Sequence, residues 1–173
     1  MATPGLGGIE WVTSRDAEDT TVLLVRPDNI GQDRTAGVEL SANASPTKWF
    51  SAFLTADLFD YREWGEITGQ DFNRGNFHWR SSLRLTATLP TSTQLQLSGW
   101  FSSPSTAAQG SSAAWYSASA AVKQFFLKRA LSVTLRCSNL ISPTAWKSWS
   151  EGSGFHTNSS YSNERYVLSL AVN

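Results

Sequence analysis

The sequence predicts an all-β fold, an antiparallel up-and-down transmembrane β-barrel segment of about eight long strands with short periplasmic turns and long outer loops. Three observations indicate this fold. Apolar and polar residues alternate for about a dozen positions at a time, most clearly within residues 76–126. Short and long connections alternate along the chain, as they do in outer-membrane barrels. The expected strands reach about 11–14 residues, longer than the five or six usual in soluble sheets.

The composition fits one domain and excludes several kinds of site. The 173 residues carry 14 basic and 14 acidic side chains, so no basic excess indicates a nucleic-acid partner. Cys137 is the single cysteine, which excludes an internal disulfide and a Cys-rich metal site. No run approaches the roughly 18 apolar residues of a membrane helix. We expect residues 1–8 to be a flexible lead-in without a secretory signal, and residues 9–173 to form the barrel segment.

Four strands are predicted in the first half of the chain, where apolar residues fall on every second position. Asp, Asn, Gly and Pro residues separate them, as turns require. The alternation is clearest where Val38, Leu40 and Ala42 share one face. The expected elements are strands at 9–14, 21–27, 34–44 and 49–63, turns at 28–33 and 46–48, and a longer loop at 64–75.

The second half of the chain predicts five more strand segments with the same alternation. Leu83, Leu85, Leu95 and Leu97 belong to its apolar face, and Ser, Thr, Gln, Arg and Lys form the opposite face. The expected elements are strands at 77–89, 94–101, 116–123, 131–138 and 166–172, short turns at 90–92 and 126–129, and long loops at 103–113 and 142–160.

The polar face predicts a water-facing wall with no catalytic, cofactor or metal site. The acidic residues around 57–71 do not have the spacing of a calcium loop, so we interpret them as a solvated loop. The many Ser and Thr residues on this face favour a wide lumen over one filled by side chains. The charged and imidazole side chains expected to face the lumen are Glu39, Asp57, His78, Arg80, Arg84, Lys123 and Arg136.

Aromatic residues gather near the expected strand ends, where interfacial rings of a membrane protein lie at headgroup level. Large rings are rarer at the centres of the strands, where Ala, Ser and Thr predominate. This distribution predicts two aromatic girdles. The candidates are Trp49, Phe50, Tyr61, Trp64, Trp79, Trp100, Trp115, Tyr116 and Phe125.

Several short motifs resemble a known family in their order and spacing. They are Arg26-Pro27, Asn29, Gly37–Leu40, Pro46–Trp49, Thr106–Gly110 and Phe126–Arg129. Over roughly Ile9–Val172 the chain resembles the C-terminal barrel of the outer membrane β-barrel family allied to TonB-dependent receptors, common in Bacteroidetes-type bacteria.

The resemblance implies a barrel of about twenty or more strands around a plug, with energised uptake of large nutrients or siderophores. It implies residence in the outer membrane of a Gram-negative bacterium, with the C-terminus on the periplasmic side. The expected partners are outer-membrane lipid, the remaining strands and the plug. We expect this chain to supply roughly the last third of such a barrel wall, without plug or signal peptide, and to be no enzyme.

Two alternatives remain open at this point. A soluble β-sandwich module binding carbohydrate would use Trp100, Trp115 or Trp146 as stacking platforms, and one face of each strand would enter a two-sheet core. A small closed porin-like barrel of eight strands shares the strand positions and differs only in closure. Pairing of Ile9–Ser14 or Thr21–Pro27 with the last strand would favour the closed barrel.

Overall fold

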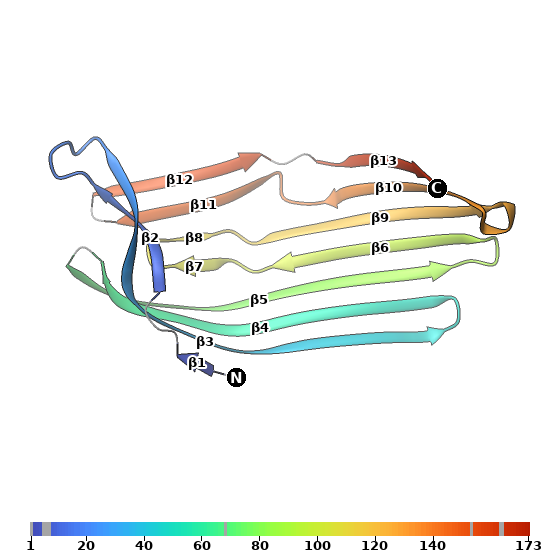
Figure 1. Ribbon diagram of the computed structural model, residues 1–173, viewed down its shortest axis with the longest axis horizontal. Coiled ribbons are helices and arrows are strands. Elements are labelled where there is room, and N and C mark those ends of the chain that lie inside the picture. Colours follow the sequence, from blue (N-terminus) through green and yellow to red (C-terminus); the bar gives the residue numbers. More distant parts are fainter. Residues whose placement is uncertain (1, 5–7, 68, 153, 163–164) are drawn as a thin grey trace.

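The computed structural model describes residues 2–4, 8–67, 69–152, 154–162 and 165–173 as two antiparallel sheets (Figure 1). The larger has nine strands in the order β1-β3-β4-β5-β6-β9-β10-β13, with β2 also paired to β3; the smaller has the order β12-β11-β8-β7. The strands are β1 (Ala2–Pro4), β2 (Gly8–Arg15), β3 (Leu23–Thr47), β4 (Phe50–Ile67), β5 (Gln70–Thr88), β6 (Thr93–Ser102), β7 (Ser105–Ala107), β8 (Gly110–Ser112), β9 (Trp115–Phe126), β10 (Leu131–Ile141), β11 (Ala145–Gly152), β12 (Phe155–Ser162) and β13 (Val167–Val172).

The N-terminal strands are longer and more continuous than the sequence pattern predicted. Strand β3 runs for 25 residues through Asp28–Asp33, so the expected turn there is wrong. This stretch stays extended because it pairs with β2 on one side, and with β4 from Gly31 onward on the other. The described part of the expected lead-in is also paired, since Ala2–Pro4 lie beside residues 34–36 of β3; residues 1 and 5–7 are outside the described residues.

The three segments predicted as long loops are largely strands. Residues 64–75 extend β4 and β5, which pair as far as Ile67 and Gln70. Residues 103–113 contain β7 and β8, and residues 142–160 contain β11 and most of β12. The prediction of loops was wrong because Ser, Thr, Asn and Gly hide the alternation of apolar and polar residues that marks a strand in sequence. Backbone pairing with a neighbouring strand does not require this alternation.

The smaller sheet continues the hairpins of the larger one beyond short breaks. The partners Ser102–Trp115 and Ser105–Ser112 keep the same register on both sides of the break between β6 and β7. Pro104 and Pro143 lie in such breaks, where their missing N–H groups interrupt the ladder. The breaks divide long hairpins into an inner and an outer part.

Short connections join the strands at the opposite end. Residues 90–92 form the turn between β5 and β6 as predicted, and Leu127–Arg129 form a single 3-10 turn between β9 and β10. Strand β3 extends to Thr47, so its turn is at Lys48–Trp49, slightly later than expected. No helix in the described ranges is long and apolar enough to cross a membrane.

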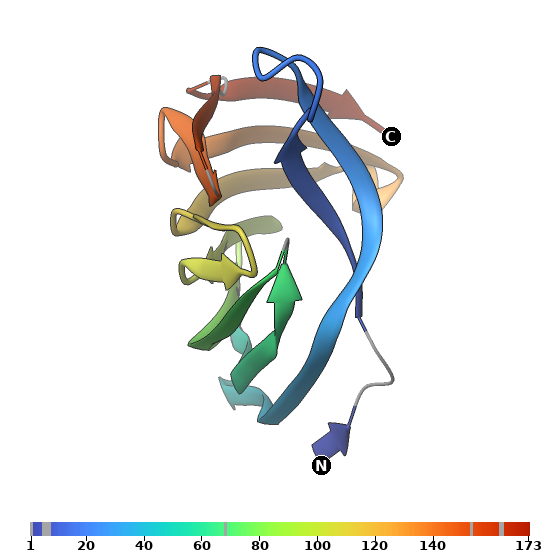
Figure 2. The same ribbon diagram turned by 90° about the vertical axis from the view of Figure 1, so that its left-hand side faces the viewer.

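The large sheet curves into an open trough, with β2 and the first half of β3 on its open side (Figure 2). We call these two segments the arm. The arm turns away where Gly31 and Gly65 face each other, and a Cβ on either glycine would collide with backbone of the other strand. Val12 and Ile30 of the arm pack with Ala108 into the buried apolar cluster of the described residues, with Ile67 and Phe72 beside it.

Candidate functional site

The strand register aligns the apolar residues of neighbouring strands into one continuous face. Leu54 lies between Ala42 and Leu83, and Leu97 lies between Leu85 and Ala120. These side chains are not covered by protein, since Leu54 is 44% and Leu97 48% exposed. An exposed apolar face of this extent is expected to contact lipid or another apolar partner.

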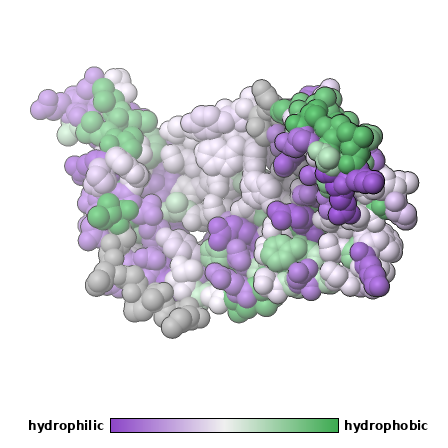
Figure 3. Space-filling model, turned by 45° about the vertical axis from the view of Figure 1, so that its right-hand side comes forward, coloured by the Kyte–Doolittle hydropathy of each residue, from purple (hydrophilic) through white to green (hydrophobic). Residues whose placement is uncertain are grey.

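The apolar face has a definite height along the strands. On β4 it runs from Phe50 to Leu58, and the next two residues on the same face are Asp60 and Arg62. Eight steps of about 3.4 Å give roughly 27 Å of strand, close to the band about 25 Å tall of outer-membrane barrels. Figure 3 shows strongly apolar surface at the end of the molecule where β10 and β13 lie, with polar surface directly beside it.

The predicted aromatic residues divide between the two faces. Phe50, Trp79 and Tyr116 lie on the apolar face, and Trp79 stacks on Phe101 with ring centroids 4.3 Å apart. Trp64 shares this face farther out, and Trp49 is in a turn. Register places four others beside hydroxyl or amide residues of the polar face, because nearness to a strand end does not decide which way a ring points. These four are Tyr61, Trp100, Trp115 and Phe125.

The polar face brings part of the predicted lumen set together. Glu39, Asp57 and Arg80 are cross-strand neighbours on β3, β4 and β5, and Arg80 approaches Asp57 to 3.5 Å. Phe59 lies next to this pair, with the Arg80 guanidinium 5.6 Å from its ring centroid and the His78 ring 4.9 Å away. The Asp57 carboxylate neutralises the charge of Arg80. The cluster therefore helps to hold neighbouring strands of the wall together.

His78 contacts the break between β6 and β7. Its Nδ1 lies 3.1 Å from the Ser103 hydroxyl and 3.2 Å from the Pro104 carbonyl, and its Nε2 lies 3.4 Å from the Ser102 hydroxyl. Three consecutive residues at the break therefore reach the same ring. We interpret His78 as a side chain that stabilises the chain where the strand is interrupted.

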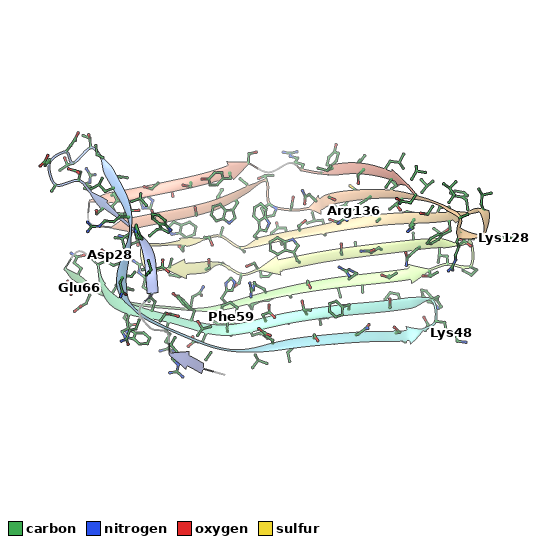
Figure 4. The ribbon with its side chains drawn as sticks, in the orientation of Figure 1. Asp28, Lys48, Phe59, Glu66, Lys128 and Arg136 are labelled. Atoms are coloured by element: carbon green, nitrogen blue, oxygen red, sulfur yellow. The ribbon has the colours of Figure 1, made fainter. Side chains whose placement is uncertain are left out.

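The remaining predicted lumen cations, Arg84, Lys123 and Arg136, are also on the polar face. No acidic side chain of the described residues lies within 4.0 Å of them. Charge is also uneven along the molecule, since Lys48 and Lys128 mark its short-turn end and Asp28 and Glu66 the other (Figure 4).

The arm is fastened to the outer parts of the hairpins by specific hydrogen bonds. The Gln109 side chain both accepts from the Thr13 amide at 2.8 Å and donates to the Thr13 carbonyl at 2.9 Å. Arg15 donates to the Gly154 carbonyl at 2.7 Å. Beneath β2 lies a cavity of about 290 Å³ whose opposite wall is a row of serines: Ser105, Ser112, Ser148 and Ser159.

Glu63 is a buried carboxylate under the arm that the sequence pattern did not single out. Its residue is 3% exposed and Oε2 has no hydrogen-bond partner. Burial raises the pKa of Glu63, and the carboxylates of Glu10 and Asp33 raise it further, against smaller opposing effects of Tyr61 and Arg74. Burial raises the pKa of Tyr61 to about 12, together with the Glu63 carboxylate and the same two acidic neighbours. Glu63 lies beyond the apolar band, and its burial depends on β2, far away in sequence.

The described residues contain no group of three or more His, Cys, Asp or Glu arranged to hold a metal ion. The acidic residues that we interpreted as a solvated loop lie instead on the paired strands β4 and β5. His156, expected in a loop, is on β12 opposite Glu151. The arrangement therefore offers two extended faces, one apolar and one polar.

Comparison with known protein families identifies the family of this chain. The profile of the Outer membrane protein beta-barrel family matches residues 8–173. No curated protein and no solved structure matches the chain.

Proposed function

Because the chain belongs to the outer membrane protein β-barrel family, we propose that its membrane wall is part of a large TonB-dependent receptor-like barrel that imports large nutrients or siderophores. The membership itself establishes an outer-membrane β-barrel wall. We propose that its exposed apolar face contacts lipid. Members of such a family are typically structural or transport proteins. The receptor type, the import and the enclosed plug are the proposed part.

The observation that carries the proposal is the direction of the two outermost membrane strands. Strands alternate in direction from β3 through β4, β5, β6, β9 and β10 to β13, so β3 and β13 run the same way. Among the described residues, none pairs with the free side of β3 at 37–47 or with the free side of β13. Unpaired backbone groups are costly in lipid, so further strands are needed between these two edges.

Self-closure of these seven strands would require a parallel β3–β13 seam, whereas bacterial outer-membrane barrels use even numbers of antiparallel strands. A wider barrel also suits the small hydroxyl side chains of the polar face, which would not fill a narrow lumen. We propose that plug residues face this polar wall. We also propose that the short turns and the C-terminal strand end lie on the periplasmic side, as short turns do in this class of protein.

Disulfide trapping tests the open wall against the small closed barrel. In a Cys137→Ser background, Ser41→Cys or Asn43→Cys is combined with Ser169→Cys, all on the polar face of β3 and β13. An open wall in phosphatidylcholine nanodiscs forms no intramolecular disulfide, because the two strands stay far beyond the usual Cα separation of about 4.4–6.8 Å. Efficient intramolecular trapping in either pair would favour the small closed barrel and contradict the proposal.

Insertion itself is tested separately, by circular dichroism and by heat-modifiable migration on gels. The lipid-facing wall predicts β structure that requires detergent or lipid, and aggregation without it. A monomeric, folded protein in plain buffer would favour the soluble β-sandwich instead.

A further inference from the structure

We propose that the polar face of this wall contains a binding site for small phosphate- or carboxylate-bearing anions, centred on Lys123 and Arg136. The proposal rests on the barrel assignment above, which turns this face toward the lumen. It extends that assignment by naming the charge class of solute that the lumen attracts.

On the polar face, residues that lie opposite one another on neighbouring strands form cross-strand rows. Three successive rows, those of Arg84, Arg136 and Lys123, each contain one cation. Arg84 is in the row with Ser98 and Ser119. The next row toward the short turns, through Gln96 and Ala121, contains Arg136. Rows on one face are about 7 Å apart, because every second residue points the same way. The cations therefore lie at regular intervals along the wall, toward the short turns.

The following row contains Lys123, opposite Gln94 on β6 and Thr134 on β10. Lys123 and Arg136 are thus diagonal neighbours on adjacent strands, a relation that places the two residues about 7–8 Å apart. The long side chains of residues this close can reach a single anion between them, and such an anion relieves the repulsion between the two like charges. Arginine and lysine donate charge-assisted hydrogen bonds to phosphate and carboxylate oxygens.

The cationic series ends at the short turn. The Lys123 ammonium lies 4.9 Å and the Arg129 guanidinium 5.5 Å from the centroid of the Phe125 ring. Both cations are therefore held near one aromatic ring on the side of the polar face. An anion leaving the Lys123–Arg136 pair toward this end meets a further positive charge.

Acidic residues that could neutralise this part of the wall are missing from the sequence itself. Residues 72–150 contain eight Lys and Arg and no Asp or Glu, so β6, β9 and β10 carry no acidic side chain. The nearest acidic residues on the polar face, Glu39 and Asp57, are in the row of Arg80, and Asp57 already pairs with Arg80. The distribution favours a mobile anion as the partner of Lys123 and Arg136.

Isothermal titration with inorganic pyrophosphate tests the site on the full chain in nanodiscs of zwitterionic phosphatidylcholine at low salt. We expect saturable binding to the wild type, weakened at least tenfold in the Lys123→Gln/Arg136→Gln double variant. The matched control, Lys48→Gln/Lys147→Gln, removes the same charge from a turn and from β11, and is expected to bind as the wild type does. An acetylated hexaglutamate peptide serves as the second ligand.

Equal weakening in both double variants would show general attraction to positive charge and overturn the proposal, as would no binding to a wild type that is folded and inserted. If hexaglutamate binds more than tenfold more tightly than pyrophosphate does, the site belongs to an acidic polypeptide, and the proposal of a small anion is overturned. Heat-modifiable migration of every sample separates these results from failed insertion, which would contradict the barrel assignment instead.

Discussion

A charge placed on the apolar face at mid-height tests the assignment of the two faces. Leu54 lies at the centre of the Phe50–Leu58 band, four residues or about 14 Å of strand from either end. Arginine at the midplane on the lipid face of a barrel costs about 2–4 kcal/mol. For Leu54→Arg we therefore expect the folded-to-unfolded ratio to fall about 25- to 700-fold, at about 1.4 kcal/mol per tenfold change.

Ser51→Arg provides the matched control on the same strand. Ser51 is on the polar face opposite Thr86, so its arginine enters the water-facing side and is expected to cost at most about 0.5 kcal/mol. Urea titrations in phosphatidylcholine vesicles, followed by tryptophan fluorescence, give both free energies of unfolding. A cost for Ser51→Arg equal to or above that for Leu54→Arg would refute the face assignment. Two costs near zero would refute contact with lipid.

Three further predictions concern the arm. Gly65→Ala brings a methyl group against the Ile30 backbone and is expected to lower the free energy of unfolding by about 1–3 kcal/mol through overpacking. The control is Gly75→Ala, whose methyl group would have its nearest contacts 3.4 Å away. In urea titrations this control is expected to be nearly neutral. Gln109→Ala removes both hydrogen bonds to Thr13, and we expect the Thr13 amide to exchange at least tenfold faster with deuterium while amides of β9 keep their protection. The raised pKa of Glu63 means that the folded state holds this proton at a higher pH than the unfolded state. The stabilisation by this proton is therefore fully present below the ordinary pKa of 4.5, and it is lost as the pH rises from there through the raised pKa. Glu63→Gln is expected to abolish this loss, and a variant with the same pH profile of unfolding as the wild type would contradict the prediction.

The membrane part of the fold was predictable because side-chain direction in a strand is decided locally. Leu83, Leu85, Leu95 and Leu97 share a face in the sequence pattern, and the register brings them together as expected. The polar set followed from the same rule, and the pairing of Asp57 with Arg80 needed only the strand order in addition.

The outer parts were not predictable from the pattern, because their structure depends on distant partners. Asp28–Asp33 has turn composition, yet strands on both sides keep it extended. Glu63 looks like an ordinary exposed acid, and its burial results from the arm, which contains Glu10, 53 positions earlier in the sequence. Four of the aromatic candidates were assigned by their place along a strand alone, which leaves the face undetermined.

The hydrogen bonds that fasten the arm also constrain the order of folding. Thr13 meets Gln109 across 96 positions of sequence, and Arg15 meets Gly154 across 139. Closing loops of this length costs entropy that only long-range contacts repay, so such contacts form late. The first strands of the chain therefore dock only after the β7–β8 and β11–β12 hairpins exist. A docked arm is therefore present only when the rest of the wall has already assembled.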